Sequence, residues 1–310
     1  MAGSVYEWYG YRGSDLSAEA AAAATEHHCP FLDGACTKTG GACSILPTES
    51  NQPVIVCPAR LYFRGHEFLK TIASDAFAAF DFRADDAGLP VLVPGSKAVS
   101  EASANRQVQI GVFGHGWDKE IQLPPSSEGG ASYSVDFTII AVSPEGDLLG
   151  FAPVEVQTID TTNNYRASLE GLAAGRQQVQ SKVGLNWENV SKRILPQLIV
   201  KGLMLQGEGL CTHGIYFVTP EPVFARIARR LGGFDRLREI PNQPGSITFV
   251  RCAYDPAQAP ADGTTLELEV AAMTTISTSD MSIAFISPLN LPPAGAYEGR
   301  LRKELRIPKN

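Results

Sequence analysis

The segment YSVDFTIIAVSPEGDLLGFAPVEVQTI, residues 133–159, decides the fold. Residues 133–142 and 149–159 are rich in β-branched and aromatic side chains, which favour strands. Between them, SPEGD at 143–147 has the composition of a turn. The segment therefore predicts a hairpin, or two strands that lie close together in one sheet.

Helix and strand patterns continue on both sides of this segment. Apolar residues recur at helical spacing over 66–80, and residues 107–113 alternate as a strand does, whereas 84–106 are typical of a loop. A longer helix is expected over 185–206, with Pro196 as a kink. Further strands are expected at 215–218, 247–254 and 266–272, with a helix at 220–231 and a short one at 20–24 that Ser17 caps.

These patterns predict the domain organisation. No internal repeat is visible, and the mixture of strands and helices indicates an α/β or α+β fold rather than two separable domains. We expect an N-terminal segment at 1–65 that joins a core at 66–310 in one compact unit.

Composition and charge narrow the class of protein. No apolar run of the 310 residues approaches the ~18 that a membrane span needs, and residues 1–10 lack a basic-then-apolar export signal. We therefore expect a cytoplasmic protein with no membrane partner. The net charge is −7, yet eleven Lys and Arg oppose five Asp and Glu over residues 176–251. This local surplus fits either a nucleic-acid-binding surface or a set of solvated helix faces.

Four of the six cysteines, Cys29, Cys36, Cys43 and Cys57, lie in a stretch rich in Gly, Pro, Thr and Ser that has no periodicity. Something other than a hydrophobic face must order this stretch, and four thiolates satisfy a tetrahedral ion such as zinc or iron. Without an export signal, the chain does not favour disulfides. The spacing matches no common finger with paired CxxC knuckles, so free buried thiols are the alternative.

Polar side chains interrupt the two central strands. Asp136 stands within the first, and Glu155 and Gln157 are two residues apart in the second, so these two side chains leave the same face. Asp136 can reach that face from the neighbouring strand. Two carboxylates at the end of a sheet form a hard oxygen site for Mg²⁺, which can activate water for phosphodiester hydrolysis. The alternative is that all three are surface residues of an exposed strand face.

Three motifs in the same order resemble the NotI and EagI family of type II restriction endonucleases, over roughly residues 25–220. CPFL at 29–32, the Cys36 and Cys43 spacing and VCPAR at 56–60 look like that family's iron-binding cysteine segment. VEVQTID at 154–160, followed by NYR at 164–166, is similar to its active-site strand and turn. LNWENVSKRILPQLI at 185–199 is especially close to the EagI branch.

The resemblance implies a fold and a chemistry. It implies a PD-(D/E)XK restriction-endonuclease-like core, a mixed sheet flanked by helices, with a small N-terminal Cys₄ segment holding one structural iron or zinc ion. Asp136, Glu155 and Gln157 would form the catalytic set, with Gln157 in place of the usual Lys and Glu120 as a further acid. Asp136 and Glu155 would bind the catalytic Mg²⁺.

The resemblance also implies a DNA substrate. The expected activity is double-strand cleavage of a G·C-rich palindromic site centred on GGCC, by a homodimer whose subunits each cut one strand. Candidate DNA contacts follow the catalytic strand and lie on the next helix: Asn163, Asn164, Arg166, Lys192 and Arg193. Two alternatives stay open, a defence nuclease of relaxed specificity and a DNA-binding protein that does not cleave.

Overall fold

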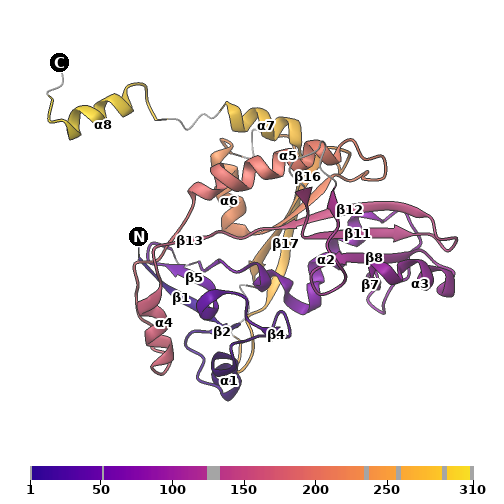
Figure 1. The fold of residues 1–310 in the computed structure, drawn as a ribbon, viewed down its shortest axis with the longest axis horizontal. Coiled ribbons are helices and arrows are strands. Elements are labelled where there is room, and N and C mark those ends of the chain that lie inside the picture. Colours follow the sequence, from indigo (N-terminus) through magenta and orange to yellow (C-terminus); the bar gives the residue numbers. More distant parts are fainter. Residues whose placement is uncertain are drawn as a thin grey trace.

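A seven-stranded mixed sheet forms the centre of the molecule (Figure 1). The computed structural model describes residues 2–50, 52–123, 133–233, 237–255, 260–287 and 292–307. The strand order is β17-β16-β15-β12-β11-β8-β7. These strands are β7 (Leu92–Pro94), β8 (Gln109–Gly114), β11 (Phe137–Val142), β12 (Leu148–Val156), β15 (Ile215–Pro220), β16 (Ser246–Tyr254) and β17 (Leu268–Ser277). Pairs β12–β15, β15–β16 and β7–β8 are parallel, and the other pairs are antiparallel.

The predicted hairpin is confirmed. Strands β11 and β12 pair antiparallel, with Phe137 opposite Val154. In the turn, the Ser143 backbone amide donates to the Asp147 carbonyl at 2.9 Å, and Gly146 has φ 93°, a left-handed conformation that glycine adopts without strain. The hairpin brings the start of β11 and the end of β12 together at the same end of the strands.

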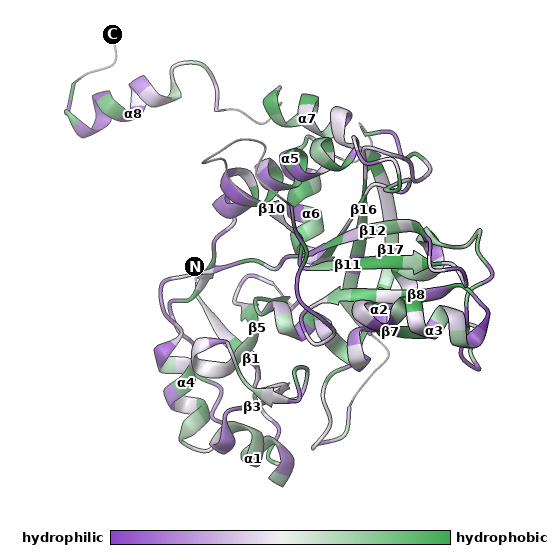
Figure 2. Cartoon of the chain, turned by 45° about the vertical axis from the view of Figure 1, so that its right-hand side comes forward, coloured by the Kyte–Doolittle hydropathy of each residue, from purple (hydrophilic) through white to green (hydrophobic). Residues whose placement is uncertain are grey.

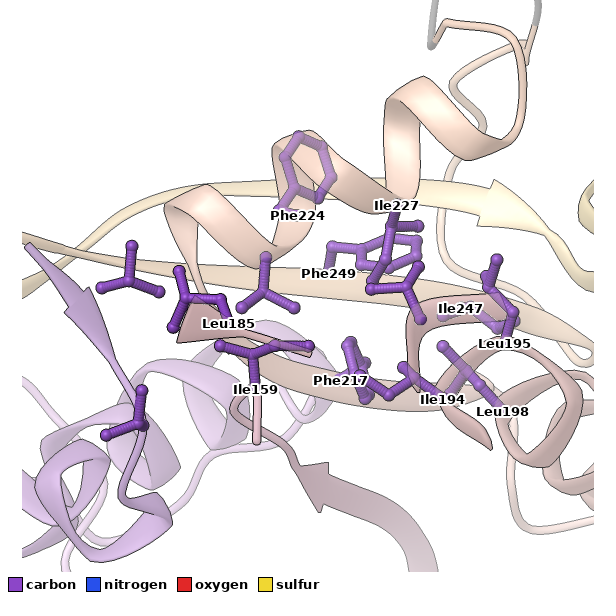
Figure 3. Close-up of a cluster of buried hydrophobic side chains, with 14 of the residues drawn as sticks. Ile159, Leu185, Ile194, Leu195, Leu198, Phe217, Phe224, Ile227, Ile247 and Phe249 are labelled. Atoms are coloured by element: carbon purple, nitrogen blue, oxygen red, sulfur yellow. The ribbon is translucent and has the colours of Figure 1, made fainter. Parts of the chain in front are cut away.

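Helices cover both faces of the sheet because successive strand residues point to opposite sides. On one face, Phe217 and Phe249 pack under α6 (Glu221–Arg230) and α5 (Leu195–Leu205), in the cluster of Figure 3. On the other face, Tyr216 and Phe137 belong to the cluster that α2 (Phe63–Ala76) covers. The central strands are therefore buried on both sides, and β11 is hydrophobic along most of its length (Figure 2).

Helix boundaries differ from those expected. The helix expected over 185–206 consists of a π-helical turn, η4 (Val190–Ile194), followed by α5, and Pro196 lies in the first turn of α5, directly after the π-helical turn. The stretch 84–106 was expected to be a loop but contains α3 (Ala98–Asn105). That prediction was wrong because α3 packs through Ala98 and Ala102, small residues that give little hydrophobic periodicity.

The N-terminal segment builds a second, four-stranded sheet in the order β2-β1-β5-β6. Its strands are β1 (Gly3–Trp8), β2 (Tyr11–Arg12), β5 (Ala42–Pro47) and β6 (Val54–Ile55). A buried ion pair links it to the core: Arg60 Nε lies 2.8 Å from Glu7 Oε1, and Tyr254 of β16 donates to Glu7 Oε2 at 2.5 Å. The side chains of Arg60 and Glu7 are fully buried, and removal of either would leave an uncompensated charge.

The remaining elements are short. As expected, Ser17 caps a helix, α1 (Ala18–Glu26), by accepting a hydrogen bond from the Ala20 amide. The others are β3 (His28–Cys29), β4 (Gly34–Ala35), β9 (Gln122–Leu123), β10 (Tyr133–Ser134), β13 (Thr161–Thr162), β14 (Gly184–Leu185), α4 (Arg166–Ala173), α7 (Thr278–Ile286), α8 (Ala296–Glu304) and 3₁₀ turns at Thr39–Gly41, Pro58–Tyr62 and Gly95–Lys97. Within the described ranges, no helix is long and apolar enough to cross a membrane.

Candidate active site and cysteine cluster

Asp136 lies at a bend directly before β11 rather than inside the strand. Its Oδ2 accepts a hydrogen bond from the backbone amide of Val156 at 2.7 Å, and Val156 is the last residue of β12. The hairpin register therefore fixes the Asp136 carboxylate beside Glu155. The sequence predicted that Asp136 reaches this edge from the neighbouring strand, and it does.

Glu155 and Gln157 leave the same face of the sheet, as their spacing predicts. Both are half-buried, whereas Val156 between them is buried on the opposite side. The Gln157 backbone amide donates to the Val218 carbonyl of β15 at 3.0 Å, which fixes its position in the sheet. Both side chains line a small cavity that α5 closes from above through Lys201.

Lys201 is the residue of this cavity that the sequence reasoning missed. Its Nζ lies 2.6 Å from Glu155 Oε2, and the two side chains are only 13% and 14% exposed. A signal was present, because Lys201 is the one charged position in the inward stripe of the helix, between Leu198 and Leu205. From the sequence alone, Lys201 is one of the cations in the basic surplus over residues 176–251.

The two carboxylates of the site repel each other. Burial raises the pKa of Glu155, and the charge of Asp136 raises it further, while Lys201 and then Arg193 lower it. Burial also raises the pKa of Asp136. The hydrogen bond from the Val156 amide and the charge of Lys201 lower it by a smaller amount. Desolvated carboxylates held together in this way favour a bound cation, because a cation relieves both the repulsion and the desolvation penalty.

Glu120 lies near this pair without joining it. Its side chain is exposed, and its charge adds to the raised pKa of Asp136. Residues 124–132, which connect its segment to β10, lie outside the described residues. Glu120 is therefore close enough to act on the site electrostatically, and it is a less direct member of the site than Asp136 or Glu155.

Asp136 and Glu155 offer an open pair of donors rather than a closed metal cage. Among the described residues, no group of three or more His, Cys, Asp or Glu has the arrangement of a metal site. Mg²⁺ in phosphoryl-transfer sites takes one or two carboxylates and completes its shell with water and substrate phosphate oxygens. Asp136 and Glu155 supply two such carboxylates, with Gln157 beside them.

The five candidate DNA contacts are exposed, and all have partners within the protein. Arg166 pairs with Glu170, Lys192 with Glu188 and Arg193 with Asp160. Asn163 Nδ2 donates to the Lys182 carbonyl at 3.1 Å, and Asn164 Oδ1 accepts from the Arg166 amide. Surface ion pairs of this kind are weak and exchange readily for phosphate partners, so the contacts leave the DNA-binding prediction open.

The cysteine segment contains two similar turns, but the described residues, which include all four of its cysteines, hold no group of three or more His, Cys, Asp or Glu that could bind a metal ion, so the structure does not confirm the expected Cys₄ site. In CPFL and in CPAR, the backbone amides two and three residues after the cysteine point at its sulfur. Burial raises the pKa of Cys29 and of Cys57, and the hydrogen bonds from these amides lower it by a smaller amount. Amides aimed at sulfur favour the thiolate, the form that binds metal. Cys29 and Cys57 share one buried cluster, with Cys36 packed against it, and Cys43 accepts at its carbonyl from the Cys57 amide.

No family model matches this chain, and no curated protein matches it.

Proposed function

We propose that this protein is a metal-dependent DNA endonuclease with a PD-(D/E)XK-type core. The observation that carries the proposal is the meeting of Asp136, Glu155 and Gln157 at one sheet edge under the ammonium of Lys201. The mixed sheet flanked by helices agrees with such a core.

In the proposed reaction, water attacks the phosphorus atom, the bond to the 3′ oxygen breaks, and a 5′-phosphate and a 3′-hydroxyl result. Mg²⁺, when bound, lowers the pKa of water and neutralises charge on the phosphate. Asp136 and Glu155 would hold the ion, and the Val156 amide fixes the orientation of Asp136. Gln157 is neutral and positions the water by hydrogen bonding. Against burial, which raises the pKa of Glu155, Lys201 lowers it, and Lys201 supplies the positive charge that Gln157 lacks.

Mapping the ends produced from a long DNA of known sequence, with Mg²⁺ present, tests this function. Discrete fragments that share a palindromic G·C-rich site, centred on GGCC, are expected for a type II restriction endonuclease. A smear would instead favour a defence nuclease of relaxed specificity. DNA binding with no cleavage at any Mg²⁺ concentration would overturn the nuclease proposal.

The cysteine segment is proposed to bind one structural iron or zinc ion through Cys29, Cys36, Cys43 and Cys57. The supporting observation is the pair of turns whose amides point at Cys29 and Cys57. A closed Cys₄ set has no open position for substrate, so its role is to order this loop-rich segment. Elemental analysis of the purified protein, with about one iron or zinc per chain expected, tests this part separately.

A homodimer is proposed because a palindromic site calls for two-fold symmetry. Residues 292–307, which include α8 and which we call the C-terminal arm, offer a surface for a second copy of the chain. None of the residues of α8 is buried. Tyr297, Leu301 and Leu305 lie at four-residue spacing, and they are 80%, 46% and 66% exposed. The arm extends away from the body in Figure 1. An isolated helix shorter than about 12 residues is marginal in water, so a second copy that covers the stripe would stabilise it.

A further inference from the structure

A second groove lies beside the active site, between the loop that follows β14 and helix α6. Its volume is about 600 Å³. Its side chains include one aromatic ring, four cations and one acid: Trp187, Lys192, Arg226, Arg229, Arg230 and Glu188. We call it the basic groove. Because its cations outnumber its acids by four to one, the groove suits an anionic ligand.

Two of the arginines are held in fixed positions. The guanidinium of Arg226 lies 5.7 Å from the Trp187 ring, and that of Arg230 lies 4.9 Å from the Phe285 ring. Arg230 Nε also donates to Ser191 Oγ at 2.9 Å. A guanidinium stacked on a ring keeps its N–H edge available for phosphate oxygens, with little further loss of side-chain freedom.

One nitrogen atom of Arg230, a residue that lines the basic groove, lacks a hydrogen-bond partner. Arg230 Nη1 is buried and has no hydrogen-bond partner among the described residues. A buried polar atom without a partner is destabilising, more so when the group is charged. Because this atom is covered by protein, an anion in the groove would instead contact the accessible edges of the cations that line it.

The basic groove and the catalytic cavity lie along one helical path. Ser191 and Lys192 of η4 line the groove, whereas Ile194 at the end of η4 and Lys201 of the following helix α5 line the cavity. Ten helical residues from Ser191 to Lys201 span about 15 Å. That is less than half of the ~34 Å turn of B-DNA, so one duplex can contact both places.

We propose that the basic groove binds backbone phosphates of the DNA that flank the scissile phosphate. This inference rests on the proposed nuclease function and adds a register-setting contact to it. Phosphate contacts fix where a duplex lies on a protein without reading its sequence. The bases would be read by other residues.

Charge-neutralising substitutions test the basic groove. The double variant Arg226→Gln/Arg229→Gln is compared with Arg106→Gln, an exposed arginine beyond the end of α3. Kd is measured by fluorescence anisotropy for a duplex with the mapped cleavage site and for a scrambled duplex, over a range of salt, with Ca²⁺ replacing Mg²⁺. Each lost phosphate contact lowers the slope of log K against log salt by about 0.9.

We expect the double variant to bind both duplexes at least tenfold more weakly, with a slope lower by roughly 2. Arg226→Lys should keep the slope, since it keeps the charge, and Arg106→Gln should match the unmodified chain. If the double variant also matches it while cleavage persists, the groove proposal falls and the nuclease stands. Weakened binding of the specific duplex alone would mean that the groove reads bases, which overturns the phosphate assignment. If the unmodified protein neither binds nor cuts DNA, both proposals fall.

Discussion

Replacing Lys201 with Met tests whether its ammonium is the counter-charge of the Asp136 and Glu155 carboxylates. The Lys201 and Glu155 side chains are 13% and 14% exposed, and Met keeps most of the apolar stem of the lysine. Removing one partner of a buried ion pair costs about 3–5 kcal/mol. Because this pair retains some solvent contact, we expect the free energy of unfolding to fall by about 2–3 kcal/mol at a pH of about 8.

The loss should depend on pH in one direction. Burial and Asp136 raise the pKa of Glu155, and Lys201 lowers it, so the Met variant raises it further. An acid whose pKa is higher in the folded than in the unfolded state destabilises the fold at high pH, and the penalty fades as pH falls through the folded pKa. Urea unfolding at about pH 8 and about pH 5 should therefore show the smaller loss at the lower pH.

Two further variants make the result specific. Lys192→Met removes an ion pair of the same type whose side chains are 71% and 73% exposed, and it should have no measurable effect on stability. Lys201→Met/Glu155→Gln also removes the Glu155 charge and leaves Asp136 with the Val156 amide, so most of the lost stability should return. If Lys201→Met is as stable as the unmodified chain at the higher pH, or if Glu155→Gln restores nothing, Lys201 is not the counter-charge.

Three other changes have defined outcomes. Asp136→Ala should abolish cleavage while Kd for DNA in Ca²⁺ stays equal or falls, because repulsion of phosphate is relieved; full activity would misplace the site. Cys43→Ser should release the iron or zinc and lower the midpoint of thermal unfolding, and a fully folded protein with no transition metal would end the Cys₄ proposal. Removing residues 288–310 should convert a dimer to a monomer in sedimentation velocity, and an unchanged mass would exclude the C-terminal arm as the interface.

Strand patterns predicted the sheet well because burial forces a strict period on strands. The hairpin of β11 and β12 could be read from its β-branched runs and from the SPEGD turn, and the period of two then put Glu155 and Gln157 on one face. Short strands within the cysteine segment, such as β5, were not predicted because Gly, Pro and Ser surround them. Their order depends on contacts with distant residues, as in the pair of Glu7 and Arg60.

Lys201 illustrates what a linear pattern leaves out. The spacing of Ile194, Leu198 and Leu205 defines an inward stripe, and a lysine in such a stripe needs a buried anion as partner. The sequence does not identify that anion, since Glu155 is 46 residues away and meets Lys201 only because β12 ends beneath α5. Under the proposed function, Gln157 considered alone indicates that the positive charge of the usual lysine is lost. Gln157 considered together with Lys201 indicates that this charge comes from a helix instead of from the strand. The activity of Lys201→Met under saturating Mg²⁺ separates the two interpretations, because a relocated charge must act on the reacting phosphate and not only on the stability of the fold.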